Sequence, residues 1–134
     1  STDLGDLPGP GGRRLSTNKY RENRSARPDT VRTLALDPLD LEGVPVVHIE
    51  AGEYIRCEVF REAGTLFAGP IDATYDTFWT SENGTPKQGW HIHFRTPDAL
   101  PVGKTSEKLK IKWSYRIGVG DDVLFDELQM TAEG

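Results

Sequence analysis

Apolar and polar residues alternate along several short segments between residues 53 and 131. The clearest case is 108–117, where every odd position from Leu109 to Ile117 is apolar or aromatic and the even positions are lysine, serine or arginine. Successive side chains of a strand point to opposite faces, so this alternation predicts half-buried strands. Similar patterns predict strands in 53–60, 72–79, 89–95 and 122–131, with further candidates in 31–36 and 44–50.

The alternation also gives each predicted strand an inward face. Besides the odd positions of 108–117, the residues expected to face the core are Ile55, Cys57, Val59, Ala73, Tyr75, Thr77, Trp79, Trp90, Ile92 and Phe94. His91 and His93 fall on the opposite, solvent-facing side of their strand. In the last segment the phase shifts between Phe125 and Leu128, which predicts a β-bulge near Glu127.

Turn residues separate these segments. Glycine occurs in Ala63-Gly64, Gly69-Pro70 and Asn83-Gly84, and the last pair suits a hairpin turn with positive φ. No segment has helical periodicity over 11 residues. Short strands separated by turns at intervals of roughly 10 to 20 residues are typical of a sandwich. We therefore predict an all-β fold, an Ig-like antiparallel β-sandwich.

Residues 1–33 differ in composition from the rest of the chain. Glycine, proline, arginine, asparagine and serine dominate there, and large apolar side chains are nearly absent. Such a segment buries too little apolar area to offset its conformational entropy, so we expect an extended arm that becomes ordered on a partner. The predicted division is an arm at 1–33 and a sandwich domain at 34–134. The arm residues expected to dock on a partner are Arg13, Arg14, Tyr20, Arg21, Arg24 and Arg27.

Charge is distributed unevenly between these two parts. Residues 1–33 hold seven Lys/Arg and four Asp/Glu, whereas 34–134 hold nine and seventeen, within a net charge of −5. A basic arm on an acidic body suits docking on an acidic protein surface. Nucleic acid is a disfavoured partner, because the body is acidic and the arm has only Tyr20 for base stacking.

Cysteine content and hydropathy indicate the compartment. The single cysteine, Cys57, excludes an intrachain disulfide and is expected to be a buried apolar residue, which favours a reducing compartment or stability gained from assembly. No apolar run is long enough to predict a membrane span, and no apolar signal region opens the sequence.

The candidate metal sites are few. His91 and His93 form an H-x-H pair whose rings share one side of a strand, and they could ligate a metal if a third group such as His48 came near. The acidic residues at 121, 122, 126 and 127 lack the spacing of a calcium loop, so a charged edge strand is the simpler interpretation. We predict no cofactor and no metal.

Catalytic signatures are missing from the sequence. There is no G-x-S-x-G elbow, phosphate-binding loop or dinucleotide fingerprint, so we predict that the protein is not an enzyme. Trp79, Trp90 and Trp113 could form a sugar-binding platform, but all three alternate in phase with core residues.

From Gly52 to Met130 the order of features resembles the Ig-like structural domains of tailed-bacteriophage virion proteins. The motifs that carry the resemblance are Ala51-Gly52-Glu53, Glu62-Ala63-Gly64, an alternating strand that ends near a glycine-containing hairpin (Asp72–Gly84), the aromatic segment Trp90–Phe94, Val102-Gly103 leading to Trp113, and Asp122–Phe125. The resemblance covers about 80 of the 134 residues, is of low specificity, and brings no catalytic residues.

The resemblance implies a virion subunit that is assembled in the host cytoplasm. Such a subunit decorates or cements the capsid, or belongs to the neck (head–tail connector) or the tail, and its partners are capsid, portal or tail proteins. It is expected to form a homo-oligomer or to sit on a lattice, with the arm crossing neighbouring subunits. The alternative is an Ig-like adhesion or carbohydrate-binding module of a cellular surface protein.

Overall fold

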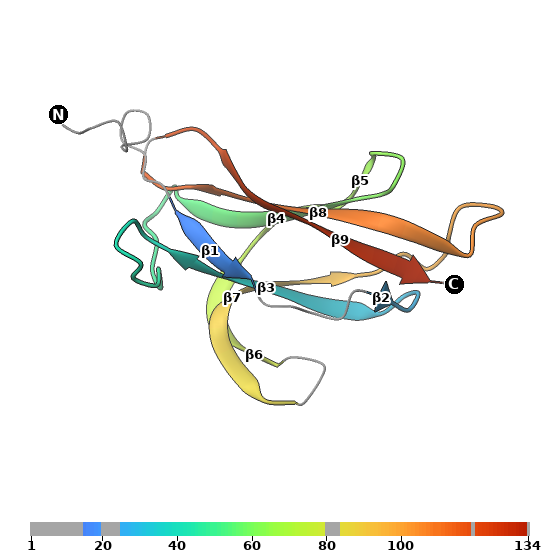
Figure 1. Cartoon of the computed structure of the whole chain (residues 1–134), viewed down its shortest axis with the longest axis horizontal. Coiled ribbons are helices and arrows are strands. Elements are labelled where there is room, and N and C mark those ends of the chain that lie inside the picture. The colour runs from blue at the N-terminus through green and yellow to red at the C-terminus, as the bar shows by residue number, and fades with distance from the viewer. Residues whose placement is uncertain (1–14, 20–24, 80–83, 119, 134) are drawn as a thin grey trace.

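The computed structural model describes residues 15–19, 25–79, 84–118 and 120–133, which form two β-sheets packed face to face (Figure 1). One sheet has the strand order β1-β3-β7-β6, and the other has the order β2-β9-β8-β4-β5. The strands are β1 (Ser16–Lys19), β2 (Ser25–Ala26), β3 (Val31–Leu39), β4 (Tyr54–Phe60), β5 (Leu66–Asp72), β6 (Thr74–Trp79), β7 (Pro86–Arg95), β8 (Ser106–Arg116) and β9 (Val123–Glu133). These described residues contain no helix, so the predicted all-β sandwich is confirmed.

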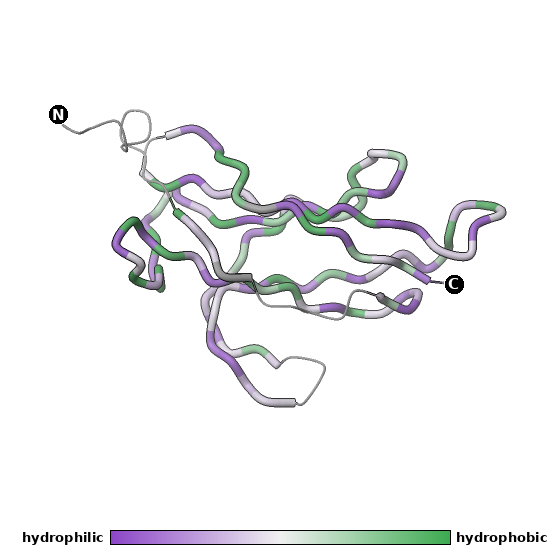
Figure 2. The backbone as a smooth tube through the Cα atoms, in the orientation of Figure 1, coloured by the Kyte–Doolittle hydropathy of each residue, from purple (hydrophilic) through white to green (hydrophobic). Residues whose placement is uncertain are grey.

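The core lies between the sheets and consists of the alternating apolar positions. In β4, Ile55, Cys57 and Val59 are fully buried, and the odd-numbered residues of β8 from Leu109 to Tyr115 are buried as well, as is Ile117 just after the strand. The alternation of apolar and polar residues along the strands is visible in Figure 2. Each fully buried aliphatic side chain contributes about 1.5–3 kcal/mol, so this inward row is the main determinant of the register.

The described part of the N-terminal segment belongs to the sheets. β1 pairs antiparallel with β3, and β2 pairs parallel with β9. The backbone N–H of Leu15 also donates to the hydroxyl of Tyr115 (3.0 Å). The predicted limit between arm and domain, at 33/34, falls inside β3. Short edge strands bury little apolar surface, so their composition does not distinguish them from an extended arm.

The chain changes sheets at Ala73, which corrects the prediction of one strand over 72–79. Asp72 ends β5 in one sheet and Thr74 begins β6 in the other. The small side chain of Ala73 is buried at the crossing, where its N–H donates to the Ile55 carbonyl (2.7 Å). Gly69, predicted in a turn, lies within β5 at a register shift, with φ of 112°.

Segment 44–50 is irregular, not a strand. Its only strand-like contact among the described residues is a bridge between Pro45 and Leu39. The Asp40 carboxylate accepts hydrogen bonds from the N–H groups of Glu42 and Val44 (2.9 Å each), which fixes a turn before the segment. Proline also lacks the N–H that a regular ladder requires. Of the apolar residues in this segment, Ile49 packs against the core, whereas Val44 and Val47 are more than half exposed.

Two local predictions concern a bulge and a hairpin turn. The β8–β9 register shifts where Trp113 faces Asp126 and Ser114 faces Leu124, so a bulge lies at Phe125, close to the predicted position. Gly84 has the expected positive φ, 65°, in the β6–β7 connection. Asn83 lies outside the described residues.

Candidate functional site

Most of the predicted arm residues lie outside the part of the chain that the structure describes. Arg13, Arg14, Tyr20, Arg21 and Arg24 belong to this group. The structure thus leaves the docking role of these residues as a prediction.

Arg27 is described, is exposed, and follows β2 directly. Its carbonyl accepts a hydrogen bond from the buried hydroxyl of Thr96 (2.6 Å), and the N–H of Thr30 donates to the same hydroxyl oxygen (2.9 Å). The backbone at Arg27 is therefore held on the sandwich while its side chain faces solvent.

The structure places the two strand histidines side by side but in different environments. The rings of His91 and His93 have centroids 5.1 Å apart. His93 is exposed, as predicted, and its Nδ1 lies 2.9 Å from the Thr33 hydroxyl. Partial burial and the neighbouring His91 lower the pKa of His93.

His91 is buried, which corrects its predicted exposure. The ring of Phe78 lies 5.1 Å from that of His91, and the Nδ1–H of His91 donates to the Gly89 carbonyl (3.0 Å). His48 pairs with Glu50 in a loop (3.2 Å). Across residues 15–19, 25–79, 84–118 and 120–133, no group of three or more His, Cys, Asp or Glu side chains is placed to hold a metal.

Two of the acidic residues near the start of β9, Asp122 and Glu127, have separate partners. Asp122 accepts a hydrogen bond from the Tyr54 hydroxyl, and the Glu127 carboxylate lies 3.6 Å from the Lys110 ammonium. The side chain of Asp126 is not among those described. The described carboxylates therefore stabilise strand neighbours and do not converge on one point.

The three tryptophans divide into two kinds. Trp90 and Trp113 are core residues, as predicted. Trp79 is 59% exposed, which corrects its expected burial. Figure 1 shows the reason: the end of the β6–β7 hairpin curves away from the two packed sheets, so none of the described strands of the other sheet lies over it there.

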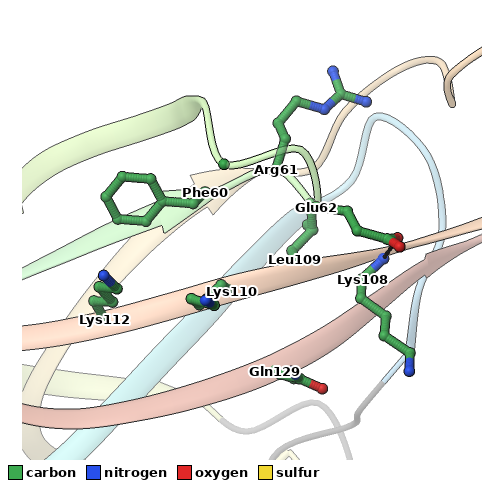
Figure 3. Close-up of a pocket in the computed structure, with 9 residues that line it drawn as sticks. Phe60, Arg61, Glu62, Lys108, Leu109, Lys110, Lys112 and Gln129 are labelled. Carbon is green, nitrogen blue, oxygen red and sulfur yellow. Dashed lines mark hydrogen bonds between the residues drawn. The ribbon is translucent and has the colours of Figure 1, made fainter.

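A pocket of about 320 Å³ opens on the outer face of the five-stranded sheet (Figure 3). It is formed by the end of β4, the turn that follows, the first half of β8, and β9. The residues that line it are Phe60, Arg61, Glu62, Gly64, Lys108, Leu109, Lys110, Lys112 and Gln129. Its lysines are the outward members of the alternating pattern of β8, so they recur every second residue, about 6.6–6.8 Å apart along the strand.

The charge of this pocket contrasts with that of the protein. Arg61, Lys108, Lys110 and Lys112 are four of the nine Lys/Arg side chains in residues 34–134, a region that also holds seventeen Asp/Glu. Glu62 is the one acidic residue in the lining. Arg61 and Lys110 already contact carboxylates of this chain, those of Glu107 and Glu127, so the lysines at 108 and 112 contribute most of the positive charge that the lining can offer to an anion.

An ion pair beneath the pocket fixes the turn after β4. The Arg61 guanidinium donates to both oxygens of Glu107, through Nη2 (2.6 Å) and Nε (3.0 Å). Only 3% of the Glu107 side chain is exposed, and 27% of that of Arg61. This contact lowers the pKa of Glu107 and raises that of Arg61.

Two further hydrogen bonds tie the turn to β8. The N–H of Glu62 donates to Glu107 (3.1 Å), and the N–H of Lys108 donates to the carboxylate of Glu62 (3.0 Å), the contact drawn as a dashed line in Figure 3. The Lys112 ammonium lies 5.2 Å from the centroid of the Phe60 ring, a cation–π contact. The pocket is therefore preorganised on paired strands, with an aromatic wall beside its lysines.

The lysines of this arrangement can bind an anion. The chain's single thiol, Cys57, faces the core, and burial raises its pKa to about 12. The alternation of lysines in 108–112 was visible in the sequence as a polar face. The contribution of the β4–β5 turn to the pocket was not visible in the sequence, because Arg61 and Glu107 are 46 residues apart.

No family model matches this chain, and no curated protein matches it in sequence. The described residues include no helix that is long and apolar enough to cross a membrane.

Proposed function

We propose that this protein is a non-enzymatic structural protein that acts by binding an acidic surface of a partner protein. The observation that supports this proposal is the row of three lysines along β8, Lys108, Lys110 and Lys112, that lines one preorganised pocket. Lysines at alternate positions of β8 match the spacing of acidic side chains on an extended partner segment, because both have the repeat of a strand.

The assembly we propose is the particle of a tailed bacteriophage. This rests on the resemblance of Gly52–Met130 to Ig-like virion domains, together with the two-sheet architecture. In such a particle the chain would serve as a capsid decoration or cement protein, or as a neck or tail component. The basic residues of 1–33 would extend the contact to capsid, portal or tail subunits.

The binding activity is tested with a fluorescently labelled peptide of alternating glutamate and threonine, measured by anisotropy against the full chain. Lys110→Glu combined with Lys112→Glu removes two favourable contacts and adds two repulsive ones. At about 0.2–1 kcal/mol for each exposed pair, the dissociation constant should rise roughly tenfold. Lys104→Glu makes the same kind of charge change in an exposed loop outside the pocket and should leave the constant within about twofold.

Two results contradict the binding proposal. One is equal affinity for a lysine–threonine peptide of the same length, and the other is an equal effect of the Lys104→Glu control.

The location is tested separately, by mass spectrometry and immunogold labelling of particles purified from the producing host. A stoichiometric signal in the particles supports a virion subunit, and absence from them contradicts it.

A second candidate function rests on the exposed Trp79. An Ig-like adhesion or carbohydrate-binding module would use an exposed aromatic ring to stack on a sugar, and Trp79 offers one whereas Trp90 does not. Binding to a glycan array that is lost in Trp79→Ala would favour this candidate. No glycan binding by the wild-type chain would remove it.

A further inference from the structure

The strand β6 is an exposed sheet edge with one local hydrogen bond: the N–H of Thr77 donates to the carboxylate of Asp76 (2.7 Å), and this bond would have to open if Thr77 pairs through its backbone. Within the described part of the chain β6 pairs with β7 on one side and has no strand on the other. Its sequence, Thr-Tyr-Asp-Thr-Phe-Trp, has strong β propensity and one charge. It contains no lysine or proline, the residues that commonly prevent edges from pairing with other chains.

The position of β6 makes this edge accessible. The end of the β6–β7 hairpin extends from the body of the sandwich (Figure 1), and the side chains of Thr77 and Trp79 are exposed there. An exposed edge of this kind can accept another strand through backbone hydrogen bonds. The question is which strand fits it.

We propose that the partner is β6 of a second copy, paired antiparallel about a two-fold axis at Thr77. This joins the four-stranded sheets of the two copies into one continuous sheet. A two-fold axis perpendicular to the sheet keeps each residue on the same face in both copies. Facing residues must therefore both be odd-numbered or both be even-numbered.

The residues of β6 select among the registers that satisfy this condition. An axis at Asp76 sets two carboxylates directly opposite each other, which is destabilising. An axis at Thr77 pairs the two threonines and places Tyr75 of each copy opposite Trp79 of the other. Aromatic cross-strand pairs and threonine pairs are both stabilising.

Charge also favours the register centred on Thr77. In that register Asp76 of one copy faces Phe78 of the other, and Phe78 is paired with Lys87 within its own copy. The carboxylate of Asp76 in one copy and the ammonium of Lys87 in the other copy therefore lie on the same face of the joined sheet. The two-fold axis produces this arrangement twice. Opposite charges in this arrangement guide the register.

The first test is the mass of the full chain by light scattering coupled to size-exclusion chromatography, over a range of concentrations from micromolar to millimolar. Wild type should show a concentration-dependent dimer. Thr77→Lys sets two ammonium groups opposite each other and should raise the dimer dissociation constant about tenfold or more. The control Leu66→Lys adds the same charge to β5, an edge of the other sheet, and should leave the dimer unchanged.

The second test is oxidative cross-linking of Thr77→Cys, with Thr74→Cys as the matched control. Facing residues have Cα atoms about 4.5–5.5 Å apart, within the range for a disulfide. The two Thr74 positions would lie six residues apart along the strands, about 20 Å. Cys57 is buried and does not compete.

A covalent dimer of Thr77→Cys but not of Thr74→Cys supports the proposal. Wild type that stays monomeric throughout, with no cross-link of Thr77→Cys, overturns it. So does a dimer that resists Thr77→Lys or is lost in Leu66→Lys. Because the lysine pocket lies on the other sheet, these results are independent of the proposed binding of an acidic partner.

Discussion

Replacing Glu107 by glutamine should destabilise the fold through the turn that forms one wall of the pocket. The carboxylate of Glu107 accepts hydrogen bonds from Nη2 and Nε of Arg61 and from the N–H of Glu62. Removing one member of a buried ion pair costs about 3–5 kcal/mol, because the remaining charge loses its partner. Arg61 keeps 27% of its side chain exposed and can be partly hydrated, so we expect a loss of about 2–3 kcal/mol.

The assay is urea unfolding followed by tryptophan fluorescence, to which the buried Trp90 and Trp113 contribute. With a slope of about 1–3 kcal/mol per molar urea, the midpoint should fall by about 0.7–3 M. Glu133→Gln is the control, since Glu133 is an exposed carboxylate of the same sheet, opposite Ser106, and its loss should change stability by less than about 0.5 kcal/mol. A loss below about 1 kcal/mol for Glu107→Gln would refute the assignment of Arg61–Glu107 as the anchor of the turn.

Three other predictions follow from the same structure. The folded-state pKa of Glu107 lies below its reference value of 4.5, so the stability that its carboxylate contributes is present above that value and is lost as the pH falls through the folded pKa. The urea midpoint of the wild type should therefore fall between pH 6 and pH 3, and the midpoint of Glu107→Gln should fall less. The Cys57 thiol, fully buried and with a pKa of about 12, should react with iodoacetamide only in denaturant, and rapid alkylation of the native protein would contradict its burial. Gly69→Ala places a Cβ 2.7 Å from the Cys57 carbonyl oxygen at a φ of 112°, whereas the Cβ of Gly64→Ala, at a φ of 102°, meets open space. The melting temperature should therefore fall further in Gly69→Ala than in Gly64→Ala. Equal decreases would argue against a steric contribution at Gly69.

The fold was predictable where one face of a strand is buried. In β8 the inward positions from Leu109 to Tyr115 are apolar or aromatic, and a shift of one residue would bury its lysines, so pattern and register agree. The same reasoning identified β7 and the bulge in β9. It failed at Ala73, because alternation does not reveal which strand lies next to a segment, and a chain can change sheets without breaking the pattern.

The site was less predictable, because it depends on contacts between distant segments. His91 lies on the outer face of its strand, yet Phe78 from the neighbouring strand packs against it. Trp79 follows the inward phase, yet it lies beyond the end of the core. The pocket combines a polar face of β8 with a turn some 46 residues earlier, and the two are joined by the ion pair of Arg61 with Glu107 and by hydrogen bonds between Glu62 and β8.

The most direct test of the central claim is an NMR titration of the ¹⁵N-labelled full chain with the alternating glutamate–threonine peptide. If the pocket binds acidic segments, the shifted amide signals will cluster at residues 60–64, 108–112 and Gln129, and the shifts will weaken as salt is added. Shifts confined to residues 1–33 or to β6, or no shifts at all, would contradict the assignment of this pocket as the docking site.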